Sequence, residues 1–378
     1  RVERFRAAIR EKVERNGIAR GSLHRYGTAA LVHVVNEHCI LPTRNFQENR
    51  FEKAERVSGE EIARTILARQ EGCHGCPVAC GRVTAVGDMK GSGPEYETIW
   101  AFGPACGVDD LGAIARAGHL CNDYGLDTIS TGSTIACAME FSERGYIPDD
   151  IRFGDGDRVI ELVQQIGRRE GIGDQLAEGS YRFAARYGHQ EISMSVKGLE
   201  MPGYDPRGLL GQGLEYATSV RGACHVYGNM LYPEVLGVPE KLDPSVTDGK
   251  AHMVKHMQDL AAVLDSAGIC LFSERIFTVG DYAAMLSALT GRGIDASEML
   301  RTGERIWNLQ KLFNVAAGFT RRDDNLPQRM SREPLTSGPY AGQVWRRQPM
   351  LDEYYRERGW NREGVPTKRK LKSLGLVR

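Results

Sequence analysis

Three closely spaced cysteines constrain this chain more than any other feature of its sequence. Cys73, Cys76 and Cys80 follow a C-x2-C-x3-C spacing. Thiolates bind soft metals, and one short loop can direct several sulfurs at a single centre. Three such ligands require a fourth, and His74 is a weak candidate for it. The stronger candidates are the remaining cysteines, namely Cys39, Cys106, Cys121, Cys137, Cys224 and Cys270.

The cysteine spacing favours an iron–sulfur cluster over a zinc ion. A zinc site usually combines two short-spaced pairs of ligands, and this sequence has no second pair. Pro77 directly follows Cys76, and a proline beside a ligand cysteine is found in ferredoxin-like loops. Zinc binding and a set of buried, unreactive thiols stay open as alternatives at this point.

The composition excludes several classes of protein. The chain has 49 Lys and Arg residues against 49 Asp and Glu residues, and this balance argues against nucleic acid or a membrane surface as a partner. No apolar run approaches the roughly 18 residues that a membrane span needs. Nine cysteines are an odd number, and the N-terminus is charged and amphipathic rather than a signal peptide. We therefore expect a cytoplasmic protein whose clustered thiols serve as ligands or catalysts.

Most of the chain has helical periodicity, so the sequence predicts a mainly α fold of two helical domains with few short strands. Predicted helices lie near 109–121, 133–144, 157–170, 174–187, 250–264, 281–290 and 296–316, and predicted strands at 82–86 and 191–197. The glycine-rich stretch 197–213 predicts a boundary between a domain of residues 1–200 and one of residues 201–378. The basic C-terminal tail, KRKLKSLGLVR, is expected to be a frayed, solvated end.

Six ordered motifs resemble the aldehyde ferredoxin oxidoreductase family. The resemblance extends from LPTRNF (41–46) to beyond residue 320, and its motifs are CHGCPVACGR (73–82), GPEYET (93–98), CNDYGLDTISTG (121–132), VKGLEMPGYDPRG (196–208), RGACH (221–225) and DSAGIC (265–270). Members of this family contain tungsten, or sometimes molybdenum, in a bis-pterin cofactor together with one [4Fe–4S] cluster. The resemblance implies the second and third domains of such an enzyme, both mainly helical.

Family members begin with a β-rich domain that supplies much of the pterin-binding surface, and nothing in this chain corresponds to it. Residue 1 is Arg and not Met, and it falls where the second domain of the family would begin. We therefore expect an incomplete catalytic unit. The missing domain would be explained by a truncation, a gene fragment or a separate chain.

The resemblance assigns the metal ligands. In the family, the fourth cluster ligand ends a D-x-x-G-L-C motif, and Asp265 to Cys270 matches this motif with Ile269 in place of Leu. Cys73, Cys76, Cys80 and Cys270 are therefore expected to hold the [4Fe–4S] cluster. Cys224 lies beside His225, but tungsten has no protein ligand in typical members of the family.

The resemblance also implies the residues that contact the pterin. The companion D-x-x-G-L-D motif occurs as Asn122 to Asp127, with an amide where the family has a carboxylate. Carboxylates and amides accept hydrogen bonds from the N–H edge of a pterin, although Asn122 does not supply the charge of Asp. The residues expected to bind the cofactor are Asn122, Leu126, Asp127, Arg221, Asp265 and Leu271.

Two residues are expected to take part in catalysis. Family enzymes have a glutamate in the segment that matches GPEYET and a histidine in the segment that matches RGACH. Glu97 is expected to act as general base, with a pKa raised by burial, and Glu95 is its rival. His225 is expected to donate a hydrogen bond to the substrate carbonyl as negative charge develops on the oxygen.

The predicted function is the oxidation of aldehydes to carboxylic acids, with electrons passed through the [4Fe–4S] cluster to ferredoxin. The expected partners are ferredoxin or a ferredoxin-like subunit, and a homodimer is possible for this family. One alternative is the tungsten subunit of an aromatic acyl-CoA reductase-like complex. Another is an iron–sulfur electron-transfer or scaffold module that lacks the pterin.

Overall fold

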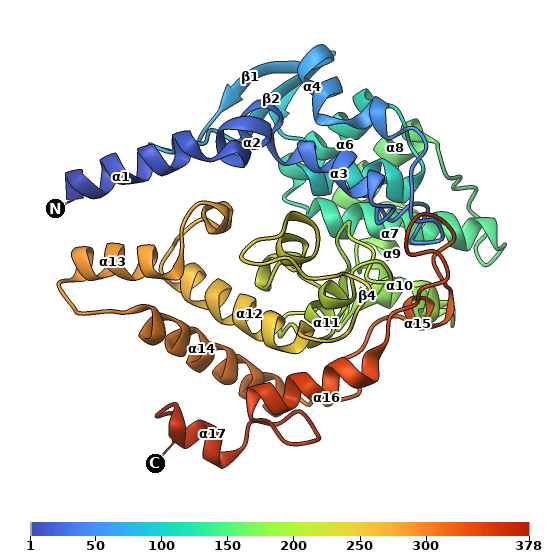
Figure 1. The fold of residues 1–378 in the computed structure, drawn as a ribbon. Helices are drawn as coiled ribbons and strands as arrows, with labels where there is room; N and C mark the ends of the chain where they lie inside the picture. Colours follow the sequence, from blue (N-terminus) through green and yellow to red (C-terminus); the bar gives the residue numbers. More distant parts are fainter. Residues whose placement is uncertain (1, 378) are drawn as a thin grey trace. The chain divides into compact units, whose positions relative to one another are not determined.

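The computed structural model describes residues 2–377 of the chain. It confirms the predicted fold class, because the chain is mainly helical with a few short strands (Figure 1). The chain divides into two compact units that are each discontinuous in sequence. The cysteine-loop unit comprises residues 21–208 and 326–345, and the α12–α14 unit comprises the described residues of 1–20, 209–325 and 346–378. The predicted domains 1–200 and 201–378 stay a prediction.

Some helices of the cysteine-loop unit, such as α6, begin and end at residues with clear capping roles. The Asp110 carboxylate accepts hydrogen bonds from two N–H groups at the start of α6, and α6 ends at Gly125, which has a φ of +70°. The α-helices of this unit are α2 (Leu23–Tyr26), α3 (Leu31–Glu37), α4 (Gly59–Thr65), α5 (Tyr96–Phe102), α6 (Leu111–Tyr124), α7 (Thr128–Glu143), α8 (Gly156–Arg168), α9 (Ile172–Leu176), α10 (Ser180–Arg186) and α15 (Gln328–Arg332).

An antiparallel sheet of three strands carries the cysteine motif. Its order is β1 (Leu67–Glu71), β2 (Gly81–Val86) and β3 (Met89–Ser92), and the cysteines lie in the connection from β1 to β2. The structure confirms the predicted strand at 82–86 as β2. The sequence analysis missed β1 and β3, because neither has the apolar–polar alternation of a half-buried strand. The other predicted strand, 191–197, is reduced to β4 (Ser195–Val196), which pairs with β5 (Leu199–Glu200).

A buried charge network joins residues 326–345 to the rest of the cysteine-loop unit. The Arg329 guanidinium pairs with the Glu140 carboxylate on α7 at 2.6 Å. Asn45 donates a second hydrogen bond to Glu140, at 2.7 Å. Both charged groups are almost fully buried, and such a pair is tolerated in the interior only when it is well hydrogen-bonded.

The α12–α14 unit is built around two long helices that pack against each other at close range. A Cβ atom at Gly303 on α14 would lie 1.8 Å from the backbone oxygen of Asp259 on α12, so only glycine permits this approach. The α-helices of this unit are α1 (Val2–Arg15), α11 (Leu210–Thr218), α12 (Lys250–Ser266), α13 (Val279–Thr290), α14 (Ala296–Ala316), α16 (Arg347–Arg358) and α17 (Lys368–Ser373).

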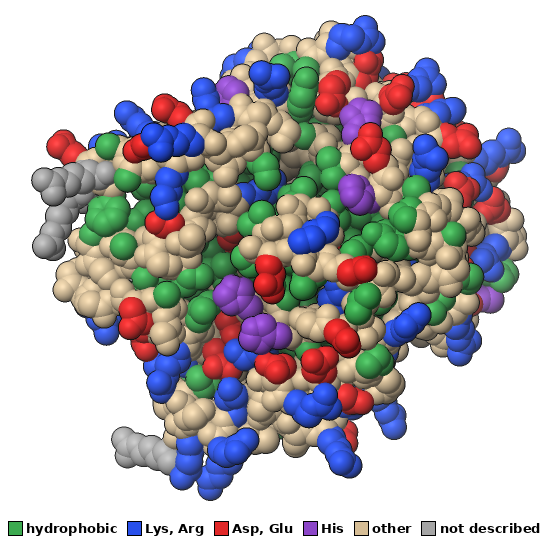
Figure 2. All heavy atoms as spheres, in the orientation of Figure 1, with side chains coloured by type: hydrophobic (Ala, Val, Ile, Leu, Met, Phe, Trp, Pro, Cys, Tyr) green, Lys and Arg blue, Asp and Glu red, His purple; other side chains and the backbone are tan. Residues whose placement is uncertain are grey.

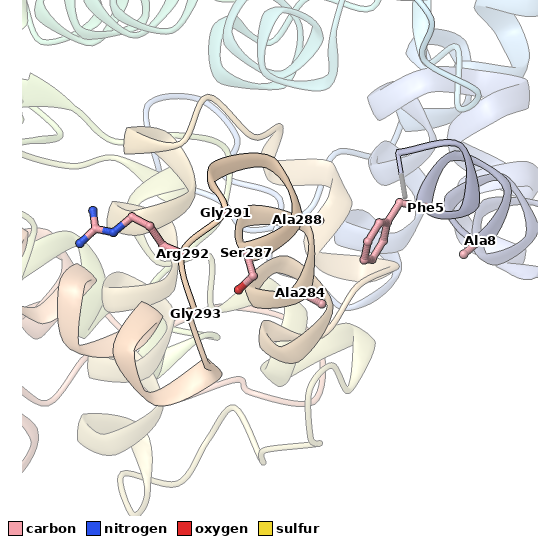
Figure 3. A pocket seen from close by; sticks show the side chains of 8 residues that line it. All are labelled: Phe5, Ala8, Ala284, Ser287, Ala288, Gly291, Arg292 and Gly293. Carbon is pink, nitrogen blue, oxygen red and sulfur yellow. The ribbon is translucent and has the colours of Figure 1, made fainter.

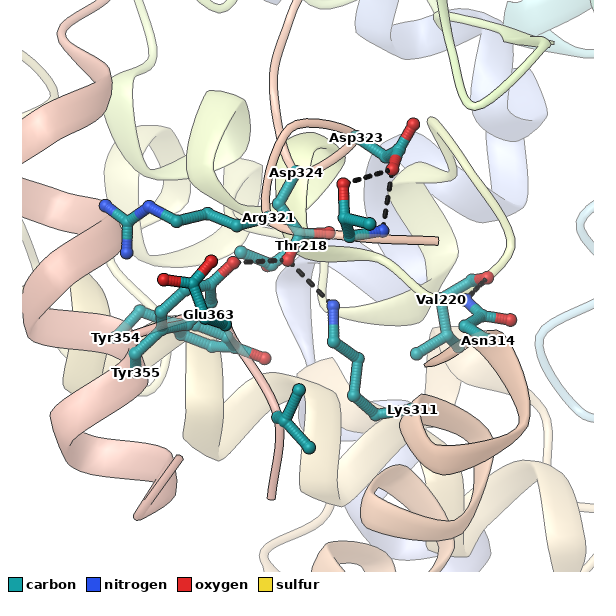
Figure 4. Close-up of polar contacts among 12 residues, drawn as sticks. Thr218, Val220, Lys311, Asn314, Arg321, Asp323, Asp324, Tyr354, Tyr355 and Glu363 are labelled. Atoms are coloured by element: carbon teal, nitrogen blue, oxygen red, sulfur yellow. Dashed lines mark hydrogen bonds and ion pairs between the residues drawn. The ribbon is translucent and has the colours of Figure 1, made fainter. Parts of the chain in front are cut away.

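Buried charges also hold the α12–α14 unit together. Lys311 on α14 pairs with the Asp324 carboxylate at 2.8 Å, and the Tyr355 hydroxyl on α16 donates to the same oxygen at 2.6 Å (Figure 4). Lys250 pairs with Glu234 at 2.5 Å, and both side chains are fully buried. The Glu234 carboxylate also accepts the backbone N–H groups at the start of α11.

Two sequence predictions about helices are corrected by the structure. The predicted helix 174–187 is interrupted at Gly179, whose φ is +83°, and forms α9 and α10 instead. Residues 368–377 of the C-terminal tail are not frayed, because Leu371 and Leu374 are buried and Lys370 pairs with Glu304 at 2.8 Å. Both the apolar residues and a basic residue of this segment therefore hold it against the unit.

The surface carries mixed charge, in keeping with a net charge of zero. Figure 2 shows acidic and basic side chains interspersed over the face that it displays. Among the described residues, we find no helix long and apolar enough to cross a membrane.

Candidate functional site

The cysteine motif forms the loop between two antiparallel strands. Glu71 of β1 lies opposite Gly81 of β2, so the two ends of the loop are close together. Inside the loop, the Cys76 N–H donates to the Cys73 carbonyl at 2.9 Å, and Gly75 adopts a φ of +69°. The strands therefore bring the segment with Cys73 and Cys76 back toward Cys80.

The nine cysteines separate by exposure. Cys73, Cys76 and Cys270 are exposed, and Cys80 is half-buried. The others are buried, namely Cys39, Cys106, Cys121, Cys137 and Cys224. The thiols that are open to solvent are therefore those of the four cysteines that the family motifs assign to the cluster.

Burial also makes four of the other thiols poor ligands. It raises the pKa of Cys121 to about 12 and that of Cys224 to about 11, and it raises the pKa values of Cys106 and Cys137 further. A metal binds the thiolate form, which such groups do not reach at neutral pH. Within residues 2–377, no three His, Cys, Asp or Glu side chains are gathered closely enough to hold one metal ion. The ligand assignment stays a prediction.

An acidic cavity of about 310 Å³ lies in the cysteine-loop unit. Three residues expected to serve catalysis or cofactor binding line it together, namely Glu97, Asn122 and Asp127. They come from the start of α5, the end of α6 and the residue before α7. Glu95 and His119 line the same cavity.

Glu97 is the more enclosed of the two candidate bases. Its Oε2 atom accepts the Gly203 N–H at 2.9 Å. Gly203 is required there, because a Cβ atom would lie 2.6 Å from the ring of Trp100. Burial raises the pKa of Glu97 to about 8, hydrogen bonds from Gly203 and Tyr204 act against this rise, and the negative charge of Asp127 adds to it.

Glu95 is exposed, in contrast to Glu97. The Thr28 hydroxyl donates a short hydrogen bond to its Oε2 atom. The same hydroxyl oxygen accepts the Tyr96 N–H at 2.9 Å. Thr28, which is distant in sequence, thus holds Glu95 at the start of α5.

The motif Asn122 to Asp127 forms the turn between α6 and α7. The Asp127 carboxylate accepts the Ser130 N–H at 2.7 Å and so caps α7. The Leu126 N–H donates to the Cys121 carbonyl at 2.8 Å. Asn122 is exposed, and its amide donates to the Ser92 carbonyl at 3.3 Å. Capping accounts for one carboxylate oxygen of Asp127 and leaves the other for a ligand.

The sequence analysis missed His119, which is buried and lies one helical turn before Asn122. Its Nε2 atom lies 3.0 Å from the Thr84 hydroxyl on β2, and that hydroxyl donates to the Gly93 carbonyl at 2.7 Å. A hydroxyl has one proton, so Nε2 carries the hydrogen that completes this chain. Burial lowers the pKa of His119, which keeps the ring neutral. These linked hydrogen bonds join α6 to the segment that precedes Glu97.

The α12–α14 unit contains the remaining site residues. Arg221 is exposed and stacks over the ring of Tyr227, 5.3 Å from its centroid. Burial and the charge of Arg221 lower the pKa of His225 to about 4. Burial raises the pKa of Asp265, and the charge of Arg221 acts against that rise. Arg221 therefore acts electrostatically on both His225 and Asp265, and burial, together with this charge, keeps His225 neutral.

Asp265 to Leu271 forms the end of α12 and the start of the next short helical turn. Gly268 adopts a φ of +68° in this turn, and both Asp265 and Cys270 are exposed. Four residues after Cys270, Glu274 is buried. Burial and the charge of Asp265 raise the pKa of Glu274 to about 8, and Arg275 acts against this rise. No sequence pattern indicates this buried carboxyl group, because a glutamate in a short polar turn is usually exposed.

A larger and mainly apolar cavity of about 670 Å³ lies elsewhere in the α12–α14 unit (Figure 3). Phe5 and Ala8 of α1 line one side, and residues of α13 and the turn that follows it line the other. None of the residues expected to take part in catalysis or cofactor binding lines this cavity.

Comparison with known families decides the relationship that the motifs suggest. The family model for aldehyde ferredoxin oxidoreductase, domains 2 and 3, matches residues 4–376. The chain belongs to the aldehyde ferredoxin oxidoreductase family. Two similar proteins are the tungsten-containing aldehyde ferredoxin oxidoreductases of Thermococcus kodakarensis and Pyrococcus furiosus, each 45% identical over 99% of this chain. The chain spans 64% of the length of each.

Two less similar proteins have names that describe other functions. The WOR-like subunit of the aliphatic sulfonate oxidoreductase of Pyrococcus furiosus is 28% identical over 94% of this chain and 58% of its own length. A solved structure of the active-site complex BamBC of benzoyl coenzyme A reductase matches with a TM-score of 0.72, 19% identity, and coverage of 92% of this chain and 59% of that chain. This match shows a shared fold.

Proposed function

We propose that this chain carries the iron–sulfur ligands and part of the pterin site of an enzyme that oxidises aldehydes to carboxylic acids. The observation that carries the proposal is the 45% identity, over 99% of the chain, to enzymes named as tungsten-containing aldehyde ferredoxin oxidoreductases. The accessible motif cysteines and the acidic cavity around Glu97 support it.

The chemistry of the donor groups fits the proposed cofactors. Cys73, Cys76, Cys80 and Cys270 would hold the [4Fe–4S] cluster, since thiolates are the usual ligands of such clusters. Asn122, Asp127 and Asp265 offer oxygen acceptors for the N–H groups of a pterin, and Arg221 offers a cation for its anionic groups. Leu126 and Leu271 would contact it through their backbone. When bound, a tungsten or molybdenum bis-pterin supplies a two-electron acceptor, and the cluster supplies a one-electron path onward.

Glu97 would remove the proton during oxidation. Its Oε2 atom is held by the Gly203 N–H, so the proton would reside on Oε1. A pKa of about 8 lies close to the working range of a general base. His225 would act as a neutral hydrogen-bond donor to the aldehyde oxygen, because its low pKa keeps it from carrying a charge.

The proposed electron acceptor is ferredoxin or a ferredoxin-like subunit, as the names of the similar enzymes suggest. A subunit of an aromatic acyl-CoA reductase-like complex is the alternative function. The match to BamBC supports only the fold, because identity to that chain is 19%. Identity of 45% to the aldehyde enzymes favours aldehyde oxidation.

The proposal is tested by metal analysis and turnover of the anaerobically purified enzyme, with the β-rich domain expected for the family supplied alongside this chain. We expect about four irons per chain, tungsten or molybdenum, and aldehyde-dependent reduction of ferredoxin. Iron without tungsten or molybdenum would favour a module that carries only the cluster. Zinc without iron would overturn the cluster assignment.

Two matched variants test the ligand assignment. Cys76→Ser changes an exposed cysteine of the motif, and Cys137→Ser changes a buried one. We expect Cys76→Ser to lose the iron and its absorbance, whereas Cys137→Ser retains both. Full iron content in Cys76→Ser would contradict the assignment.

A further inference from the structure

Arg82 is a buried cation without an ion-pair partner among the described residues. It lies on β2, two residues after Cys80, and only 3% of it is exposed. Its guanidinium donates to the backbone carbonyls of His24 at 2.6 Å and Gly81 at 2.7 Å. It makes longer hydrogen bonds, of 3.4 Å, to the carbonyls of Leu23 and Ala79. All of these acceptors are neutral.

The other buried arginines of the described chain differ from Arg82. Each forms an ion pair with a buried carboxylate, Arg207 with Asp205, Arg329 with Glu140 and Arg358 with Asp259. A guanidinium stays charged in proteins, and a charge taken out of water is costly unless a charge of opposite sign compensates it. The buried charge of Arg82 therefore needs to be compensated by an anion other than a directly paired carboxylate.

The Arg82 guanidinium lies against the end of the cysteine loop, because it donates to the carbonyls of Ala79 and Gly81 on either side of Cys80. The carboxylate that acts on it electrostatically is that of Glu95. Glu95 is exposed and is held by the Thr28 hydroxyl, so solvent screens its charge. The cysteine loop is thus the place where a strong compensating charge would arise.

Close packing holds the Arg82 side chain in this position. Gly27 adopts a φ of +64°, and a Cβ atom there would lie 2.8 Å from the Cys80 carbonyl oxygen and 3.6 Å from Arg82 Cγ. The hydrogen bond to His24 fixes the far end of the guanidinium. The guanidinium is therefore held in a fixed position beside Cys80, whereas the side chain of a surface arginine would move freely in solvent.

We propose that Arg82 is the buried counter-charge of the cysteine-ligated cluster and that its charge raises the reduction potential of that cluster. The inference rests on the proposed function, because the cluster supplies the anion. Reduction adds one electron to the cluster, taken from aldehyde oxidation and passed on to ferredoxin, and makes it more negative by one charge. A fixed positive charge nearby stabilises the reduced form more than the oxidised form.

Two substitutions separate the charge of Arg82 from its hydrogen bonds. Arg82→Lys keeps the charge and loses the planar set of donors. Arg82→Gln keeps an N–H donor and loses the charge. Arg64→Gln is a matched control, because Arg64 belongs to the same unit but is exposed and pairs with Glu61.

The reduction potential of the cluster is measured by a redox titration monitored by electron paramagnetic resonance. We expect Arg82→Gln to shift the potential to a lower value, and Arg82→Lys and Arg64→Gln to stay close to the unmodified protein. Equal shifts in the Lys and Gln variants would mean that hydrogen bonding matters and would overturn the charge inference. An unchanged potential in Arg82→Gln would also overturn it.

Thermal unfolding keeps the inference testable if a variant binds the cluster poorly. The increase in Tm that the cluster brings, relative to the metal-free protein, should be smaller in Arg82→Gln than in Arg82→Lys. Loss of the cluster from both variants alike would overturn the charge inference. A cluster absent from the unmodified protein would overturn both the inference and the proposed cluster. An intact cluster whose reduction potential is the same in Arg82→Gln as in the unmodified protein would overturn the inference alone.

Discussion

Raising the pH from 7 to 9 should increase kcat/KM for aldehyde oxidation about tenfold, if Glu97 is the general base. With a pKa of about 8, about one tenth of Glu97 is ionised at pH 7 and about nine tenths at pH 9. Only the ionised form accepts a proton. The assay is steady-state aldehyde oxidation by the metal-loaded protein across this pH range.

Three variants identify the group that causes this pH dependence. The charge of Asp127 raises the pKa of Glu97, so Asp127→Asn should move the rise in kcat/KM to lower pH. Glu97→Gln should abolish turnover but retain the metals. Glu95→Gln should keep the rise, because Glu95 is exposed and held by Thr28. A flat profile in the unmodified protein, or a shift to higher pH in Asp127→Asn, would refute the reasoning.

The raised pKa of Glu97 also has a consequence for stability that needs no cofactor. Its folded-state pKa of about 8 lies above the ordinary value of 4.5, so the folded state binds the proton more tightly than the unfolded state. This contribution is fully present below about pH 4.5 and is lost as the pH rises through about 8. The metal-free protein should therefore lose Tm relative to Glu97→Gln over this range. A Tm difference that does not change with pH would contradict the raised pKa.

Substitutions at three further positions have expected effects on stability or activity. Lys250→Met leaves Glu234 buried without its cation, and we expect a loss of about 3–5 kcal/mol in the free energy of unfolding, measured by denaturant titration. Gly303→Ala places a methyl group against the Asp259 carbonyl and should lower Tm by separating α12 from α14. His119→Leu breaks the hydrogen-bond chain toward Glu97 and should lower kcat more than it raises KM, whereas His119→Gln, which keeps a donor at the Nε2 position, should restore much of the activity.

Helices and the cysteine loop were predictable from the sequence because their signals are local. The segments 250–264 and 296–316 have strong periodicity, and they correspond to α12 and α14. Family motifs named Glu97, Asn122 and Asp127 as site residues, and the structure brings these three to one cavity. Their roles stay predictions, since a shared cavity does not test a role.

The features that the sequence did not reveal depend on contacts between distant segments. His119 belongs to the site only because β2 brings Thr84 within 3.0 Å of its ring. The C-terminal segment is packed because two of its leucines are buried, and its run of basic residues concealed this. A buried charge or a helix end is determined by what packs against it, and periodicity does not encode that information.

The strand β2 combines functions that would otherwise require separate parts of the fold. It begins directly after the predicted ligand Cys80, and it carries both Arg82 and Thr84. The Arg82 guanidinium donates to the carbonyls of Ala79 and Gly81 beside the cysteine loop, and Thr84 links α6 to the segment before Glu97. Because one short strand positions these groups, a displacement of β2 would alter the charge at the cysteine loop and the acidic cavity together. The sharper test is therefore a comparison of substitutions at Arg82 and Thr84. If β2 acts only as a rigid support, Thr84→Val should affect turnover through the cavity and leave the cluster potential unchanged, whereas Arg82→Gln should change the potential.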